Sequence, residues 1–210
     1  MSSHKKPFKP DMNKLFMLDI ETTGVDPKTE EVLQIAMLEM NWNGREWEMG
    51  RDFNFFQHTD RTPDSKFAVD HMKEIYARCN KEAAIPADDV RQRILYFCKE
   101  CGVEPPNIFF AGWNAGIFDI PFLEYHGYIK PARYVNDKLQ GDCHYRIYDL
   151  SGALQLAANI RGHNETNAMI KEAQKLAPKH KYEGSRHDAL YDCERQIHLL
   201  NGLVRLLRGD

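Results

Sequence analysis

The sequence lacks any apolar run that could cross a membrane. Its longest apolar runs, such as residues 107–112, have the length of a strand, whereas a bilayer helix needs about 20 residues. It also lacks internal repeats, low-complexity tracts and an excess of basic residues, and its net charge is −3. Proteins that hold long duplex DNA through many phosphates are usually strongly basic. These absences exclude a membrane span and predict that any contact with nucleic acid is local and short.

The five cysteines show no disulfide pattern, and their number is odd. Cys98 and Cys101 form a C-x-x-C, but there is no second such pair to complete a zinc site with four ligands. We therefore predict free thiols in a reducing compartment and a cytoplasmic protein.

The first residues, MSSHKKPFKPDMNK, are basic and contain prolines, and no apolar stretch of signal-peptide length follows them. We predict a flexible arm over residues 1–13 and a single domain over residues 14–210. The hydrophobic fraction of 42% is enough for that domain to bury a core.

The apolar pattern predicts which elements this domain contains. Strands are expected first, at 14–20, 31–40 and 46–58, with an Asn43-Gly44 hairpin turn between the last two. Further strands are expected at 107–111 and 146–148. Three strands followed by helices that alternate with strands predict an α/β domain, in which helices cover a mixed sheet.

Helices are expected in the remaining segments. Thr62 and Pro63 have the pattern of a helix cap and first residue, and further helices are expected at 88–101, at 118–126 and near residues 150 and 165. The last helix is the clearest, because apolar residues recur in it at steps of three and four: Leu190, Cys193, Ile197, Leu200, Val204 and Leu207.

Two carboxylates stand at the end of the first strand. Asp19 and Glu21 are two residues apart, so their side chains point to the same face. Their repulsion and desolvation are costly unless a cation is present, and carboxylate oxygens are ligands that Mg²⁺ and Mn²⁺ prefer. From the pattern alone, a solvated strand end before a turn is an equally good interpretation.

Two more acids have settings that indicate chemistry. Asp119 lies among apolar residues at the start of a predicted helix, where the helix dipole favours negative charge, although a simple helix cap explains it as well. Asp192 lies inside the last helix, and His187 precedes it by five residues. Because five residues do not share a helical face, we expect His187 to project from the helix start or the preceding loop. The alternative is a surface acid and a polar first-turn residue.

Together these residues form three ordered motifs, which are D-x-E-T-T-G at 19–24, N-x-x-x-F-D at 114–119 and H-x-A-x-x-D at 187–192. The set resembles the DEDDh 3′–5′ exonucleases, a superfamily that includes proofreading subunits, oligoribonuclease and ribonuclease T. The resemblance spans Lys14 to Leu207. It implies a ribonuclease H-like fold with a central mixed sheet of five strands flanked by helices.

The resemblance also implies a site. Asp19, Glu21, Asp119 and Asp192 match four carboxylates that hold two divalent metals, Mg²⁺ or Mn²⁺, and His187 matches the histidine that activates the attacking water. The tyrosine subclass is excluded, because the position four residues before Asp192 is occupied by aspartate.

The same resemblance suggests substrate contacts. Thr22 and Thr23 match residues that offer backbone or hydroxyl groups to the terminal sugar, and Val25 matches an apolar wedge between the last two bases. Asn114 belongs to the second motif, but three residues rather than two separate it from Phe118-Asp119, so its role stays open. Two other features have both a binding and a structural interpretation: Trp113 can stack on a base or pack in the protein, and the basic run 175–181 with Arg186 can guide phosphates or form a solvated loop.

The leading hypothesis is a 3′–5′ exonuclease that acts on single-stranded DNA ends in proofreading or repair and releases nucleoside 5′-monophosphates. An exoribonuclease or oligoribonuclease is the close alternative, since discrimination depends on the 2′ position of the sugar. A catalytically silent binding module would be expected to have lost an acid or the histidine. An HD-type metallophosphohydrolase, suggested by His187-Asp188, would be all-helical. Association with a second copy or a polymerase is undetermined from the sequence.

Overall fold

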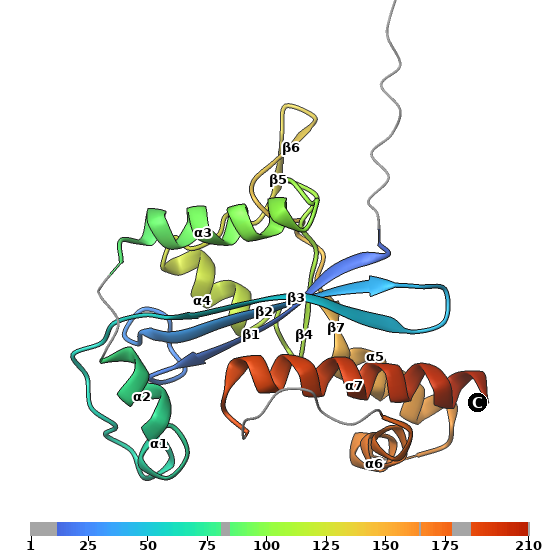
Figure 1. The fold of residues 1–210 in the computed structure, drawn as a ribbon. Coiled ribbons are helices and arrows are strands. Elements are labelled where there is room, and N and C mark those ends of the chain that lie inside the picture. Colours follow the sequence, from blue (N-terminus) through green and yellow to red (C-terminus); the bar gives the residue numbers. More distant parts are fainter. Residues whose placement is uncertain (1–11, 81–84, 164, 178–185, 210) are drawn as a thin grey trace, which may run out of the picture.

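The computed structural model describes residues 12–80, 85–163, 165–177 and 186–209, so the predicted arm over residues 1–13 falls almost wholly outside the described part. The described residues form seven helices, one sheet of five strands and a separate two-stranded hairpin (Figure 1). None of the helices in these ranges is both long and apolar enough to span a membrane.

The five-stranded sheet is mixed, as the sequence predicted. Its first three strands are antiparallel neighbours: β1 (Lys14–Thr22), β2 (Val32–Trp42) and β3 (Trp47–Phe56). Two short strands, β4 (Phe110–Gly112) and β7 (Tyr148–Asp149), extend the sheet in parallel on the other side of β1. The order β3-β2-β1-β4-β7 puts β1 in the centre of the sheet.

The apolar residues of β1 alternate between two cores. Leu15 and Met17 belong to the core on one face, while Phe16 and Leu18 belong to the core on the other. The first core includes residues of α5 (Leu150–Ile160), α6 (Thr166–Leu176) and α7 (Ala189–Arg208). The second includes residues of α3 (Ala87–Glu100) and α4 (Asp119–Tyr125), and Figure 1 shows the two helical layers on opposite sides of the sheet. Burial on both faces explains why β1 is almost continuously apolar.

The long helix α7 is the predicted last helix. The Asp188 carboxylate caps it by accepting the N–H groups of Leu190 and Tyr191, and Gly209 ends it with a φ of 79°. The first four residues of the predicted apolar stripe face the core, but Val204 is only half-buried and Leu207 is 52% exposed. Leu203 and Leu206 pack in the core instead. The prediction was therefore wrong by one residue over the last two turns of the helix.

The predicted start of the first helix was also wrong. The chain between 57 and 64 is not helical, and α1 (Lys66–His71) begins after Ser65, whose hydroxyl accepts the N–H of Ala68. Arg61, just before the predicted start, binds Glu30 and the carbonyl of Thr29 in the loop between β1 and β2. The next helix, α2 (Lys73–Cys79), follows α1 directly.

The hairpin of β5 (Arg133–Val135) and β6 (Lys138–Gln140) was not predicted. Its two turn residues, Asn136 and Asp137, have φ values of 49° and 59°, which suit a tight turn between twisted strands. The strands are mostly exposed, so they lack the apolar alternation that identifies a half-buried strand.

All five cysteines are free, as predicted, and all are buried. Burial raises the pKa of Cys143 to about 12 and that of Cys101 to about 11. Such thiols stay protonated near neutral pH and are poor nucleophiles and metal ligands.

The contact between α6 and α7 depends on a glycine. A Cβ at Gly202 would collide with the carbonyl oxygen of Ala173. We expect Gly202→Ala to lower the free energy of unfolding by about 3 kcal/mol, because the helices must move apart. Gly152→Ala in α5 is the matched control, since nothing lies within 4 Å of its Cβ, and it should stabilise the protein by about 0.5–1 kcal/mol. Urea unfolding of both variants measures this, and equal stability of Gly202→Ala and wild type would contradict the packing argument.

Candidate active site

The four predicted acids and the histidine meet in one cavity of about 390 Å³. They come from three distant parts of the chain: Asp19 and Glu21 from β1, Asp119 from the start of α4, and His187 and Asp192 from the start of α7. Ile20, Trp113, Asn114, Ile117 and Phe118 complete the lining.

Asp119 is fixed against β1 by a backbone hydrogen bond. The N–H of Ile20 donates to Asp119 Oδ1 at 2.9 Å, which ties the strand between Asp19 and Glu21 to the first residue of α4. The cap position of α4 is occupied by Phe118, which makes no side-chain capping bond. Asp119 is therefore not the N-cap of α4, and the simple capping interpretation was wrong.

His187 lies in the segment before α7, as the spacing indicated. Its φ of 69° is in the left-handed region, and its backbone N–H donates to Asp192 Oδ2 at 2.9 Å. Its ring meets that of Phe67 edge-on at 4.9 Å between centroids and lies 5.5 Å from that of His71. Ligand atoms of Glu21, His187 and Asp192 all lie within 4.8 Å of one another.

The acids are buried close to one another, and this changes their protonation. Burial, with the charge of Asp192 next, raises the pKa of Glu21 to about 8. Burial likewise raises the pKa of Asp119 to about 7. Burial and then the charges of Asp119, Glu21 and Asp192 raise the pKa of Asp19 well above its usual range. A concentration of buried oxygen ligands that repel one another fits a divalent cation of the Mg²⁺ type, which would remove the repulsion.

The family comparison agrees with this geometry. The model of the ribonuclease T exonuclease family matches residues 16–200. The chain belongs to this DEDDh-type 3′–5′ exonuclease family. No curated protein matches the sequence at a significant level.

Solved structures have the same ribonuclease H-like fold as this exonuclease. A zinc-bound complex of Escherichia coli exonuclease I with single-stranded DNA matches with 16% identity and a TM-score of 0.57, over 94% of this chain and 41% of that one. Cell-death related nuclease 4 matches with 14% identity and a TM-score of 0.62, over 92% and 64%. A full-length 3′-exonuclease matches with 13% identity and a TM-score of 0.56, over 94% and 82%. The chain thus spans about two fifths of the length of E. coli exonuclease I.

Gln196 is a site residue that the sequence analysis missed. Its Nε2 donates to Asp19 Oδ1 at 2.9 Å, and its Oε1 accepts the N–H of Trp113 at 2.8 Å. Gln196 follows Asp192 by four residues, so both project from one face of α7, and this spacing was the available signal. The neighbouring Arg195 donates from Nε to Asp192 Oδ1 at 2.9 Å. The exonuclease thus orients two of its acids through α7.

Removing the Gln196 amide should weaken metal binding. We expect Gln196→Leu, which keeps the bulk, to lower Mn²⁺ affinity by about 10- to 100-fold, because the orientation of Asp19 is no longer fixed. Calorimetric titration with Mn²⁺ measures the effect, and Gln155→Leu on the exposed side of α5 is the matched control. Unchanged affinity in Gln196→Leu would mean that the hydrogen bond does not position Asp19.

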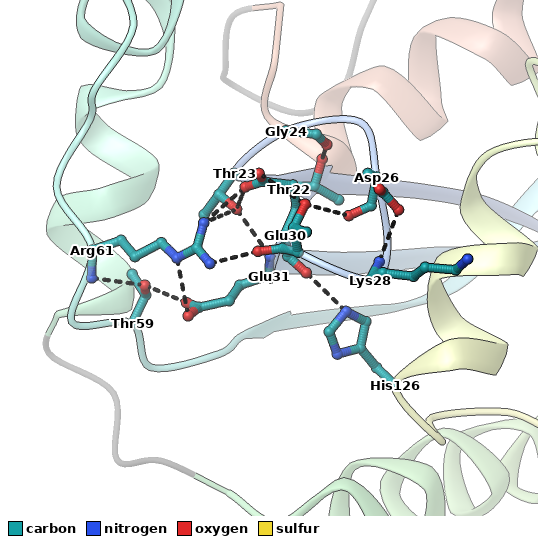
Figure 2. Close-up of polar contacts among 11 residues, drawn as sticks. Thr22, Thr23, Gly24, Asp26, Lys28, Glu30, Glu31, Thr59, Arg61 and His126 are labelled. Atoms are coloured by element: carbon teal, nitrogen blue, oxygen red, sulfur yellow. Dashed lines mark hydrogen bonds and ion pairs between the residues drawn. The ribbon is translucent and has the colours of Figure 1, made fainter.

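Three of the residues predicted to bind substrate lie at the end of β1 and in the loop that follows it: Thr22, Thr23 and Val25. Figure 2 shows the contacts of Thr22 and Thr23. Thr22 Oγ1 donates to the carbonyl of Gly24 at 2.5 Å, and Thr23 Oγ1 donates to Glu30 Oε2 at 2.6 Å. The N–H of Thr23 donates to the carbonyl of Glu31 at 2.9 Å. Both hydroxyl protons are therefore donated inside the loop. Thr23 Oγ1 also accepts the N–H of Glu31 at 2.9 Å and an Arg61 N–H at 3.4 Å, which leaves Thr22 Oγ1 as the hydroxyl oxygen that can accept a hydrogen bond from a substrate.

Arg61 holds this loop from the side. Its guanidinium contacts Glu30 Oε2 at 2.8 Å, the carbonyl of Thr29 at 2.6 Å and Glu31 Oε1 at 3.2 Å, as Figure 2 shows. Val25 is 83% exposed, so it is not a core residue. A braced loop with an exposed apolar side chain suits a wedge better than ordinary packing.

Asn114 and Trp113, which follow β4, also line the cavity. Asn114 has a φ of 56°, and its Oδ1 accepts the hydroxyl of Ser151 at 2.7 Å, which ties the loop after β4 to α5. Trp113 is 36% exposed and lines both this cavity and an adjacent one of about 660 Å³, which Arg186 and Arg195 also line. Most of the basic run 175–181 falls outside the described residues, which resume at Arg186.

Proposed function

We propose that this protein removes nucleotides from the 3′ end of single-stranded DNA and releases nucleoside 5′-monophosphates. The observation that carries the proposal is the convergence of Asp19, Glu21, Asp119, Asp192 and His187 in one cavity. Membership of the exonuclease family supports the reaction, and the single-stranded DNA bound to E. coli exonuclease I supports the substrate. The activity suits DNA repair or proofreading.

The four carboxylates would hold two Mg²⁺ or Mn²⁺ ions. When bound, such ions supply Lewis acidity for the attacking water and for the departing 3′ oxygen. The protein contributes the placement of the oxygens: the N–H of Ile20 fixes Asp119, the Gln196 amide fixes Asp19, and Arg195 with the N–H of His187 fixes Asp192.

His187 would accept the proton of the attacking water. Burial lowers the pKa of His187, so its imidazole is neutral near pH 7 and has a ring nitrogen free to take a proton. The bond from its own N–H to Asp192 keeps it beside the acids without using the ring. Mg²⁺ prefers oxygen ligands, which leaves the imidazole for proton transfer.

Val25, Thr22, Thr23 and Asn114 would shape the place for the last nucleotide. Val25 would insert between the last two bases, because its side chain is exposed on a loop that Arg61 braces. The hydroxyl oxygen of Thr22 would accept a hydrogen bond from the terminal sugar, since its proton is donated to Gly24. Thr23 would hold the loop in shape through its bonds to Glu30 and Glu31. Asn114 would support the wall of the cavity through its bond with Ser151.

The substrate is tested with matched single strands of DNA and RNA that carry a 5′ label, at the same concentration of Mg²⁺. We expect faster shortening of DNA, with nucleoside 5′-monophosphates as products. Faster shortening of RNA would assign the exoribonuclease alternative to the same site. Folded protein that cleaves neither strand would indicate a silent binding module.

A further inference from the structure

A stack of three aromatic rings leads from the core to the surface. The rings of Phe109 and His144 are nearly parallel with centroids 4.4 Å apart, and those of His144 and Tyr145 have the same separation. Phe109 and His144 are buried, whereas Tyr145 is 46% exposed. Tyr145 is therefore the outermost ring of a stack that begins in the core, and the stack fixes the position of its ring in the absence of a ligand.

A second exposed tyrosine contacts the outer ring of this stack. Tyr134 of β5 is 65% exposed, and its ring meets that of Tyr145 at 6.4 Å with an interplanar angle of 60°. The guanidinium of Arg146 lies over the Tyr145 ring, 5.6 Å from its centroid, so a base that stacks on this face of Tyr145 would meet the guanidinium. Figure 1 shows the β5–β6 hairpin standing out from the body of the domain, so the tyrosine that it carries is accessible. We call Tyr134, Tyr145 and Arg146 the tyrosine platform.

The segment that carries the platform, residues 130–146, is rich in exposed cations, although the chain as a whole has a charge of −3. Its exposed cations are Lys130, Arg133, Lys138 and Arg146. On the hairpin the only exposed acid is Asp137, and Glu124 of α4 pairs with Arg133 at 2.8 Å. Exposed aromatic faces interleaved with cations match unpaired bases joined by phosphates.

The platform is continuous with the rim of the active-site cavity. Ile147, which follows Arg146, lies beside Gly116, where a Cβ would be 3.7 Å from Ile147 Cγ1. Gly116 stands between Asn114 and Ile117, both of which line the cavity, and Ile117 is 78% exposed. A single strand that leaves the cavity over Ile117 would therefore pass Ile147, the residue next to Arg146 of the platform.

We propose that the tyrosine platform binds the single strand upstream of the 3′ end, with bases stacked on Tyr145 and Tyr134 and phosphates facing Arg146. This inference rests on the proposed function and adds a second binding site for the same substrate. A duplex would keep its bases hidden, so the platform should favour single strands. The site explains how a chain with negative net charge can hold nucleic acid longer than its catalytic cavity.

The test is fluorescence anisotropy in EDTA with labelled single-stranded DNA of about 3 and about 16 nucleotides. We expect Tyr145→Ala to weaken binding of the longer strand about tenfold and to leave the shorter one unchanged, while Tyr145→Phe retains binding. Arg146→Ala should lower the slope of log affinity against log salt by about 0.7. Tyr96→Ala is the matched control, because Tyr96 is also 65% exposed but lies on α3 in a different cavity.

Binding in EDTA is measured without cleavage, so the test of the platform is independent of the test of the proposed reaction. Unchanged affinity of the longer strand in both Tyr145→Ala and Tyr134→Ala would overturn the platform, as would duplex DNA that binds as tightly as the single strand. Tyr134→Ala is the second variant because Tyr134 lies on the exposed hairpin, outside the core clusters. If these variants lose binding while the wild-type protein cleaves neither DNA nor RNA, the platform would be supported and the proposed hydrolysis rejected.

Discussion

Asp19→Asn is expected to lower the rate of cleavage at saturating substrate by at least about a hundredfold, since it removes a carboxylate from a shared metal site. Asp19 lies in the central strand, receives the Gln196 amide and has Asp119, Glu21 and Asp192 as charged neighbours. Apart from Glu21, Asp119 and Asp192, which are themselves expected to be metal ligands, no described acid lines the cavity to replace it. Single-turnover shortening of a 5′-labelled strand in Mg²⁺ measures the loss.

Measuring the free energy of unfolding of Asp19→Asn without metal distinguishes a folding defect from a loss of catalysis. Asp19→Asn should be at least as stable as wild type in EDTA, because it removes a buried carboxyl that its neighbours repel. Asp89→Asn, an exposed acid at the start of α3, is the control and should cleave normally. Near-normal cleavage by Asp19→Asn would overturn the assignment of the site.

The stability of the metal-free protein should fall as the pH rises from about 5 to about 8. The pKa of Glu21 is raised from 4.5 to about 8, and that of Asp119 from 3.8 to about 7. In this range the folded state keeps protons that the unfolded state has lost, so the free energy of unfolding decreases with pH. The expected loss is on the order of 3 kcal/mol, and Mg²⁺ should largely abolish it.

Thermal unfolding in EDTA and in Mg²⁺, at several pH values, measures this dependence. Glu21→Gln is the informative variant, because it cannot ionise and should give a flatter profile in EDTA. A stability that rises with pH in EDTA would show that the acids are not held protonated by burial and repulsion.

The sequence predicts those parts of the fold in which a local residue pattern depends directly on burial or on side-chain direction. The apolar run of β1 indicates a strand that is covered on both faces of the sheet. The spacing of two residues between Asp19 and Glu21 indicates that both side chains point to the same face. The step of five between His187 and Asp192 correctly placed the histidine before the helix, where its φ is 69°.

The remaining features depend on partners that are distant in the chain. The bond between Gln196 and Asp19 joins residues at opposite ends of the sequence, and only the fold brings them together. Helix α1 begins after Ser65 rather than at Thr62-Pro63, in a segment where Arg61 forms an ion pair with the distant Glu30. The β5–β6 hairpin packs too few apolar residues to produce a pattern.

The most direct test of the proposed reaction is a gel assay with a single-stranded DNA labelled at its 5′ end, in Mg²⁺ and in EDTA. A ladder that shortens from the 3′ end in Mg²⁺, is absent in EDTA and is lost in Asp192→Asn is the predicted result. A label released at once as a mononucleotide, or the same ladder in EDTA, would contradict 3′-directed hydrolysis by a metal site built on these acids.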